Sequence, residues 1–171
     1  MNPTPLHQFA QYFTGANAAA AERVSARLAL VLADPEAYQI EFIEELAERG
    51  MAGALPAQEL RDVALLDALL AEDLAWEGDE QDTPAELAEA LNDILAQQGQ
   101  GLALAPGALA SHRGAGPEQL DAVQDALEPL GLALVLFTLD SDSYPLGVVA
   151  DAQAEVARQL AGALGFGVVV Y

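Results

Sequence analysis

Cysteine is absent from this chain of 171 residues. Its absence excludes a disulfide framework, a thiol nucleophile and zinc held by thiolates. Apolar runs are also short, and none approaches the roughly 18 residues that a membrane-spanning helix needs. The first thirteen residues contain neither a basic segment nor a continuous apolar one, so we predict no signal peptide and expect a cytoplasmic location.

Lysine is absent as well. The six basic residues are all arginine, against 27 acids, and the formal net charge is -21. Binding to nucleic acid or to an anionic membrane surface depends on cationic side chains that displace counterions. We therefore expect neither as a partner, and the charge indicates either solubility or attraction to a basic protein partner. No phosphate-binding glycine loop and no nucleophile elbow is present, and we expect no cofactor.

The acids are concentrated in the first half of the chain. Residues Asp34 to Asp93 include 18 of the 27 acids and only two arginines, a local net charge of -16. The pattern changes after Gln100, which divides the chain into an acidic helical region, residues 1–100, and a sandwich-like α/β region, residues 101–171. A length of 171 residues suits one domain of ordinary size, so we expect one compact domain overall.

Apolar spacing predicts a short N-terminal helix followed by about four longer ones. They are expected at residues 6–13, 16–33, 35–49 and 56–75, and from Pro84 onward. The third helix is expected to bury Tyr38, Phe42, Ile43 and Leu46 and to expose Glu41, Glu44, Glu45 and Glu48. The start of the last helix is the most clearly marked, because Thr83 and Glu86 form a capping box around Pro84.

The C-terminal region contains a continuous apolar run, Leu132–Phe137, which is typical of a strand covered on both faces. A helix from Pro117 precedes it, and a return strand at Leu146–Ala150, a helix capped by Asp151 and a strand at Gly167–Tyr171 follow. The fold class is therefore α+β, with a small antiparallel or mixed sheet. It is ferredoxin-like if Leu102–Ala105 pairs as a strand, and a three-stranded layer if it does not.

Two acids and an aromatic residue alternate just after the buried run. Asp140, Asp142 and Tyr144 would share one side of an extended segment, and two carboxylates so placed suit a hard cation. Pro145, however, stands where a calcium loop needs its glycine, and a hairpin connection explains the same residues. His112 lies in a glycine-rich loop that could overlook the sheet. General acid-base chemistry would require a partner that the sequence does not place.

Trp76 is the only tryptophan, and it is predicted to end the fourth helix next to an acidic loop. As a core residue it needs no function. If it is exposed beside Glu77, Asp79 and Glu80, it becomes a candidate contact for a basic partner.

Three segments together carry a family resemblance. They are Asp34–Tyr38, the Leu65–Leu69 helix that leads to Trp76, and Leu139–Tyr144. From about Ala16 to its end the chain resembles a bacterial family of domains of unknown function, DUF6630. The resemblance implies an uncharacterised cytosolic protein and supplies no catalytic residues.

The missing catalytic constellation and the one-sided charge together favour a non-enzymatic protein-binding module, immunity-like or regulatory, whose acidic helical face meets a basic partner. The alternative is a small-ligand or divalent-metal-binding domain, or a hydrolase, that uses Asp140 and Asp142. Mimicry of nucleic-acid charge rests on net charge alone. Val168–Val170 is strongly prone to form a strand, and at a sheet edge it could support a homodimer.

Overall fold

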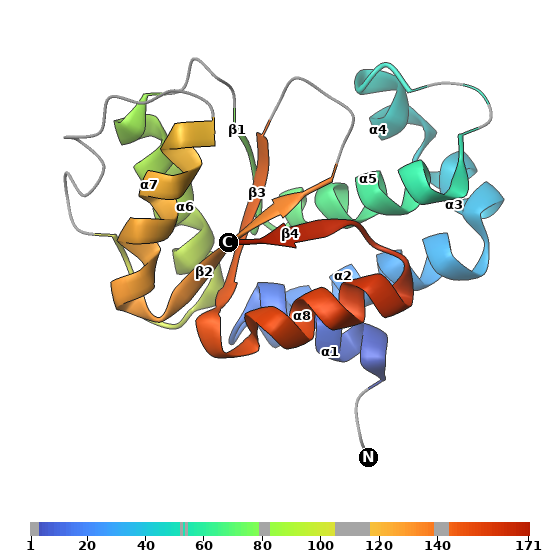
Figure 1. Cartoon of the computed structure of the whole chain (residues 1–171). Helices are drawn as coiled ribbons and strands as arrows, with labels where there is room; N and C mark the ends of the chain where they lie inside the picture. Colours follow the sequence, from blue (N-terminus) through green and yellow to red (C-terminus); the bar gives the residue numbers. More distant parts are fainter. Residues whose placement is uncertain (1–3, 52, 54, 79–82, 105–116, 139–143) are drawn as a thin grey trace.

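The computed structural model describes residues 4–51, 53, 55–78, 83–104, 117–138 and 144–171. Over these residues the chain forms eight α-helices, one short 3-10 helix and four strands. Most of the helices come first, and the strands form one antiparallel sheet (Figure 1). The predicted α+β class is confirmed.

Six helices belong to the first hundred residues. They are α1 (Pro5–Thr14), α2 (Ala18–Ala33), α3 (Pro35–Glu41), α4 (Ile43–Glu48), α5 (Ala57–Leu70) and α6 (Pro84–Gln98). Side-chain caps start several of them: Asp34 accepts a hydrogen bond from the Ala37 amide, and the capping box at Thr83 and Glu86 is complete. Both of these helix starts were predicted from the sequence, because a short polar side chain before Pro satisfies amides that the first turn leaves free.

The predicted helix over residues 35–49 is broken at Phe42, where α3 ends and α4 begins. Its inward stripe consists of Tyr38, half-buried Phe42 and Leu46, at steps of four residues. Ile43 is one residue off this stripe, and its side chain is 60% exposed. The expectation that Ile43 is buried was wrong. Ile43 directly follows Phe42, and one residue along a helix turns the side chain about a quarter turn away from the buried stripe.

Helix α5 was expected to continue to Ala75, but it ends at Leu70, and Trp76–Gly78 forms strand β1. A turn with Asp73 at φ 56° separates the two. Trp76 therefore starts a strand rather than ending a helix. Leu74 and Trp76 continue the apolar pattern of α5, so the sequence predicted a longer helix in place of a strand of only three residues.

The sheet has the order β1-β3-β2-β4, with β2 at Leu132–Phe137, β3 at Tyr144–Ala150 and β4 at Val168–Val170. Every pairing is antiparallel. Leu102–Leu104, where a strand was expected, forms none, and Ala105 lies outside the described residues. The strand on which the ferredoxin-like alternative depended is thus missing over Leu102–Leu104, and β1 supplies the fourth strand instead.

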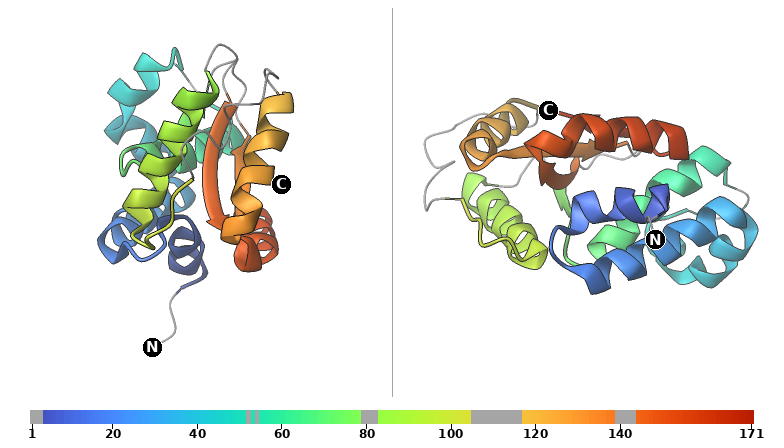
Figure 2. Two further views of the ribbon diagram at one scale, coloured as in Figure 1. Left: turned by 90° about the vertical axis from the view of Figure 1, so that its left-hand side faces the viewer. Right: turned by 90° about the horizontal axis from the view of Figure 1, so that it is seen from below.

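Helices cover both faces of the sheet, as the continuous run of β2 predicts (Figure 2). Ala133, Val135 and Phe137 pack into the cluster formed with the N-terminal helices and α8 (Asp151–Leu164). Leu132, Leu134 and Leu136 pack against α6 and α7 (Pro117–Leu127), which is followed by the 3-10 turn Glu128–Leu130. Alternate residues of one strand thus serve two cores.

Asp151 does not cap α8 as expected. It is the first residue of that helix, Ala150 occupies the cap position, and no side chain caps the end. None of the described helices combines the length and apolar character that a membrane crossing requires.

Gly147 lies in β3, and the buried ring of Phe137 on β2 packs against it. A Cβ added at Gly147 would lie 2.8 Å from Phe137 Cζ and 2.9 Å from its Cε2. We expect Gly147→Ala to lower the free energy of unfolding by about 1–3 kcal/mol, because the ring can only move into an already packed core. Urea denaturation measures this change.

Gly162→Ala is the matched control, because Gly162 lies inside α8 and a Cβ there meets no atom within 4 Å. The higher helix propensity of alanine should raise the free energy of unfolding by about 0.5–1 kcal/mol. A Gly147→Ala protein as stable as the parent would contradict the close packing of Phe137 against β3.

Candidate functional site

The residues proposed as a metal or ligand site are mostly outside the described part of the chain. Asp140, Asp142 and His112 all fall there. Tyr144 is the first residue of β3, is half-buried and packs against the cluster that includes α6 and α7. Their role as ligands stays a prediction.

Only some of the residues predicted to contact a partner lie in the described part of the chain. Asp79 and Glu80 are outside the described residues, whereas Trp76 and Glu77 are adjacent in β1. Trp76 packs against the α6–α7 side of the sheet, and Glu77 reaches Arg49. Neighbouring strand residues point to opposite faces, so these two side chains belong to different sites.

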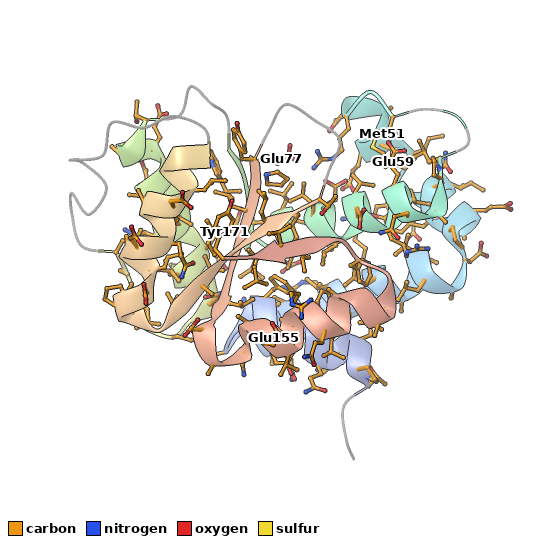
Figure 3. All side chains as sticks on the ribbon, viewed as in Figure 1. Met51, Glu59, Glu77, Glu155 and Tyr171 are labelled. Carbon is orange, nitrogen blue, oxygen red and sulfur yellow. The ribbon has the colours of Figure 1, made fainter. Side chains whose placement is uncertain are left out.

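Arg49 is the centre of the most developed polar cluster among the described residues. It follows α4 directly, and its Nε donates a 2.9 Å hydrogen bond to Asp67 Oδ1 on α5. Its Nη2 also donates to Asp67 Oδ1 and to Glu77 Oε1 on β1. One guanidinium therefore joins α4, α5 and β1. Figure 3 labels Glu77 near the upper end of the sheet in that view.

Burial sets the electrostatics of this cluster. It raises the pKa of Asp67, and the hydrogen bond and charge of Arg49 offset that rise only in part. Burial also acts to lower the pKa of Arg49, but its two carboxylate partners outweigh this and raise it above the ordinary value. Asp67 Oδ2 is buried and has no hydrogen-bond partner among the described residues. Arg49 thus stays charged beside a carboxylate that is only half satisfied.

A second arginine holds α3 and α4 against α2. The guanidinium of Arg27 lies 4.0 Å from the ring centroid of Phe42, and its Nε donates a 3.0 Å hydrogen bond to the Tyr38 hydroxyl. Its Nη2 pairs with Glu45. Burial, together with nearby acids and against the influence of Arg27, raises the pKa of Tyr38 to about 12, so the phenol stays a neutral hydrogen-bond partner.

A cavity of about 630 Å³ opens beside Arg49, and we call it the Arg49 cavity. It is lined by Glu45, Glu48, Arg49, Asp67, Leu70, Ala71 and Glu77. Four carboxylates and one guanidinium line the cavity. Arg27 neutralises Glu45, which leaves three carboxylates against the single charge of Arg49. Such a cavity favours cationic groups. Its described lining contains no hydroxyl, thiol or imidazole.

A single metal ion is not the cation that this arrangement suits. The described residues contain no group of three or more His, Asp or Glu side chains close enough to hold one. The carboxylates lie instead around a space of the size that organic ligands occupy. An ammonium or guanidinium group can be recognised by acids spread in this way.

A second cavity, of about 340 Å³, lies on the other side of β1, between the turn after α5 and helix α6. It is lined by Asp73, Ala75, Trp76, Ala90, Asp93, Ile94, Ala96 and Gln97. Five of these eight residues belong to α6, and no two of the eight form an ion pair with each other.

The Arg49 cluster was not predicted from the sequence. One signal was present: Asp67 interrupts the apolar run Leu65-Leu66-Asp67-Ala68-Leu69-Leu70, and a carboxylate in the middle of a buried helix needs a cation or donors. The sequence shows that Asp67 needs a partner. It does not show which arginine provides it, because Arg49 lies 18 positions from Asp67 and 28 positions from Glu77.

Comparison with known proteins gives one match. The family model described as "Domain of unknown function (DUF6630)" matches residues 5–171, nearly the whole chain, including the N-terminal helix that lay before the resembling segments. No curated protein and no solved structure matches significantly.

Replacing Arg49 by methionine should leave Asp67 buried without its ion-pair partner. We expect Arg49→Met to lower the free energy of unfolding by about 3–5 kcal/mol at pH 8. Without the guanidinium the pKa of Asp67 rises further, and a protonated carboxyl no longer carries the cost of a buried charge. The loss should therefore shrink as the pH falls from 8 to 5, which urea denaturation at several pH values measures.

Arg158→Met is the matched control. Arg158 pairs with Glu155 on α8, where both side chains are exposed, and Figure 3 shows Glu155 well away from Glu77. An exposed pair of this kind contributes little, so the unfolding midpoint should not change. A loss for Arg49→Met that is constant between pH 8 and pH 5 would rule out the buried charge of Asp67 as its cause.

Proposed function

The chain belongs to the DUF6630 family, and we propose that it is a non-enzymatic protein-binding module, immunity-like or regulatory, that binds a basic partner protein. The contact surface is the outer side of α3 and α4, which we call the α3–α4 face. It consists of Ile40 and Ile43 with the exposed acids Glu36, Glu41, Glu44 and Glu48.

One observation carries this proposal: Ile40 and Ile43 are the most exposed large hydrophobic side chains among the described residues, at 74% and 60%. They lie three positions apart, on either side of the break at Phe42. Single exposed apolar residues are ordinary, but two within four positions of the chain, flanked by exposed acids, resemble the apolar centre and polar rim of an interface.

The charges around the isoleucines support a basic partner. Glu36, Glu41, Glu44 and Glu48 make no ion pair with any described residue. The described arginines are already engaged: four pair with carboxylates, and Arg61 donates to the Gly165 carbonyl. Unpaired acids without free cations attract a basic surface and repel an acidic one.

Position also supports the proposal. Tyr38, Phe42 and Leu46 anchor the inner side of α3 and α4, while Arg27 and Arg49 tie it to α2, α5 and β1. The outer side is therefore presented on a fixed support and does not need to order on binding, which reduces the entropic cost of association.

We expect the tagged protein to capture a basic protein from the cytosol of its source at low salt and to release it at high salt. Replacing both Ile40 and Ile43 by serine should weaken this binding at least tenfold, because each buried isoleucine contributes about 1.5–3 kcal/mol and 1.4 kcal/mol is about a factor of ten. Titration with the purified partner by calorimetry measures the affinity.

Val156→Ser is the matched control, because Val156 is an exposed apolar residue on α8, away from the proposed surface. It should leave the affinity unchanged. Equal binding by the double serine variant, or a captured partner whose binding ignores salt, would refute the α3–α4 face as the contact surface.

A further inference from the structure

We propose that the Arg49 cavity receives one cationic side chain of the partner, a lysine ammonium or an arginine guanidinium, beside the α3–α4 face. This inference rests on the function proposed above and names the chemical group that the surface recognises. The cavity and the face share helix α4: Glu48 belongs to both, and Glu45 lines the cavity one turn away.

The charge of the cavity argues for a cation. Glu45 is neutralised by Arg27, and Asp67 and Glu77 share the guanidinium of Arg49. Glu48 has no cationic partner among the described residues. Asp67, Glu77 and Glu48 against Arg49 leave the cavity with a net charge of -2, and one further positive charge would halve this surplus. Because the carboxylates of Asp67 and Glu77 are partly withdrawn from water, their attraction for that charge is less screened.

Asp67 provides a second and independent argument. It lines the cavity with only 9% of its surface exposed, and its Oδ2 accepts no hydrogen bond from the described residues although Oδ1 is held by Arg49. A buried carboxylate oxygen is normally satisfied. What it lacks is a donor, and both candidate side chains carry several. Because Oδ2 exposes almost no surface, the lining must shift slightly for that donor to reach it.

The size and shape of the lining favour the end of a side chain over a metal ion. A volume of about 630 Å³ accepts an extended basic side chain with its methylene groups, and Leu70 and Ala71 supply apolar contact for that stem. Among the described residues no three carboxylates or imidazoles converge on one point as a metal site requires. A basic side chain with an apolar stem fits both properties of the lining.

The test uses n-butylammonium and n-butylguanidinium chloride as minimal probes of the two side chains, with n-butanol as the uncharged counterpart. Titration of the full chain at constant low ionic strength, followed by ¹H–¹⁵N correlation spectra, should give saturable shifts at the amides of Glu48, Arg49, Asp67 and Glu77. Butanol should give none. Shifts that spread over the molecule without saturating would overturn the inference.

Variants at Glu48 locate the site, because this acid forms no ion pair within the described part of the chain whose loss would disturb the fold. Glu48→Gln should weaken probe binding about two- to fivefold, as expected for one partly exposed ion pair. Glu48→Lys should abolish it by placing an ammonium in the cavity. Glu89→Gln and Glu89→Lys, on the exposed side of α6, are the matched controls and should bind the probes as the parent does.

The inference and the proposed function fail in different ways. If the probes do not bind, or bind Glu48→Lys as well as the parent, the cavity is not the receptor, while loss of partner binding in the isoleucine variants would still support the α3–α4 face. If the probes bind but no salt-sensitive protein partner is found, the assignment to a partner's side chain is overturned together with the proposed function. Binding of the probes and weaker partner binding by Glu48→Lys support both.

Discussion

The placement of α4 depends on one guanidinium shared by two carboxylates. Arg49 follows the last turn of α4, Asp67 lies in the middle of buried α5, and Glu77 lies on an edge strand. A buried ion pair adds little net stability, because removing the charges from water costs nearly as much as their attraction returns. What it provides is geometry, since the carboxylate of Asp67 is buried in the middle of α5 and needs a cation, and the arginine that reaches it directly follows α4.

The scarcity of cations extends this argument to the whole surface. With 27 acids, six arginines and no lysine, each arginine that serves an internal contact leaves the outside more negative. Arg27 on α2 and Arg49 after α4 both serve contacts within the fold, and Glu36, Glu41, Glu44 and Glu48 pair with no described cation. The same residues that fix α3 and α4 therefore produce the charge surplus of the α3–α4 face and of the Arg49 cavity.

The parts of the fold that could be predicted from the sequence are those with local causes. The continuous run of β2 predicted cover on both faces, and Thr83 with Glu86 predicted a helix start, because each signal depends on adjacent residues only. Strand β1 was missed because three residues carry no period, and its pairing with β3 spans about 70 positions. Ile43 was wrongly predicted to be buried, because a shift of one position along a helix decides whether a side chain points to the core or to solvent. The Arg49 cluster is non-local throughout, so the sequence revealed only the need of Asp67 for a partner.

The two kinds of residue on the α3–α4 face have separate physical roles. Glutamates act at a distance, so they raise the rate of encounter with a basic partner and make that rate depend on salt. Isoleucines act only on contact, so they slow dissociation once water is excluded. The Arg49 cavity joins the two roles, because a cation that enters it is both steered there and partly desolvated. A partner must therefore carry positive charge to be attracted before contact, and its surface must fit the face once contact is made. An acidic protein is repelled before contact, because none of the described arginines is free to pair with its carboxylates.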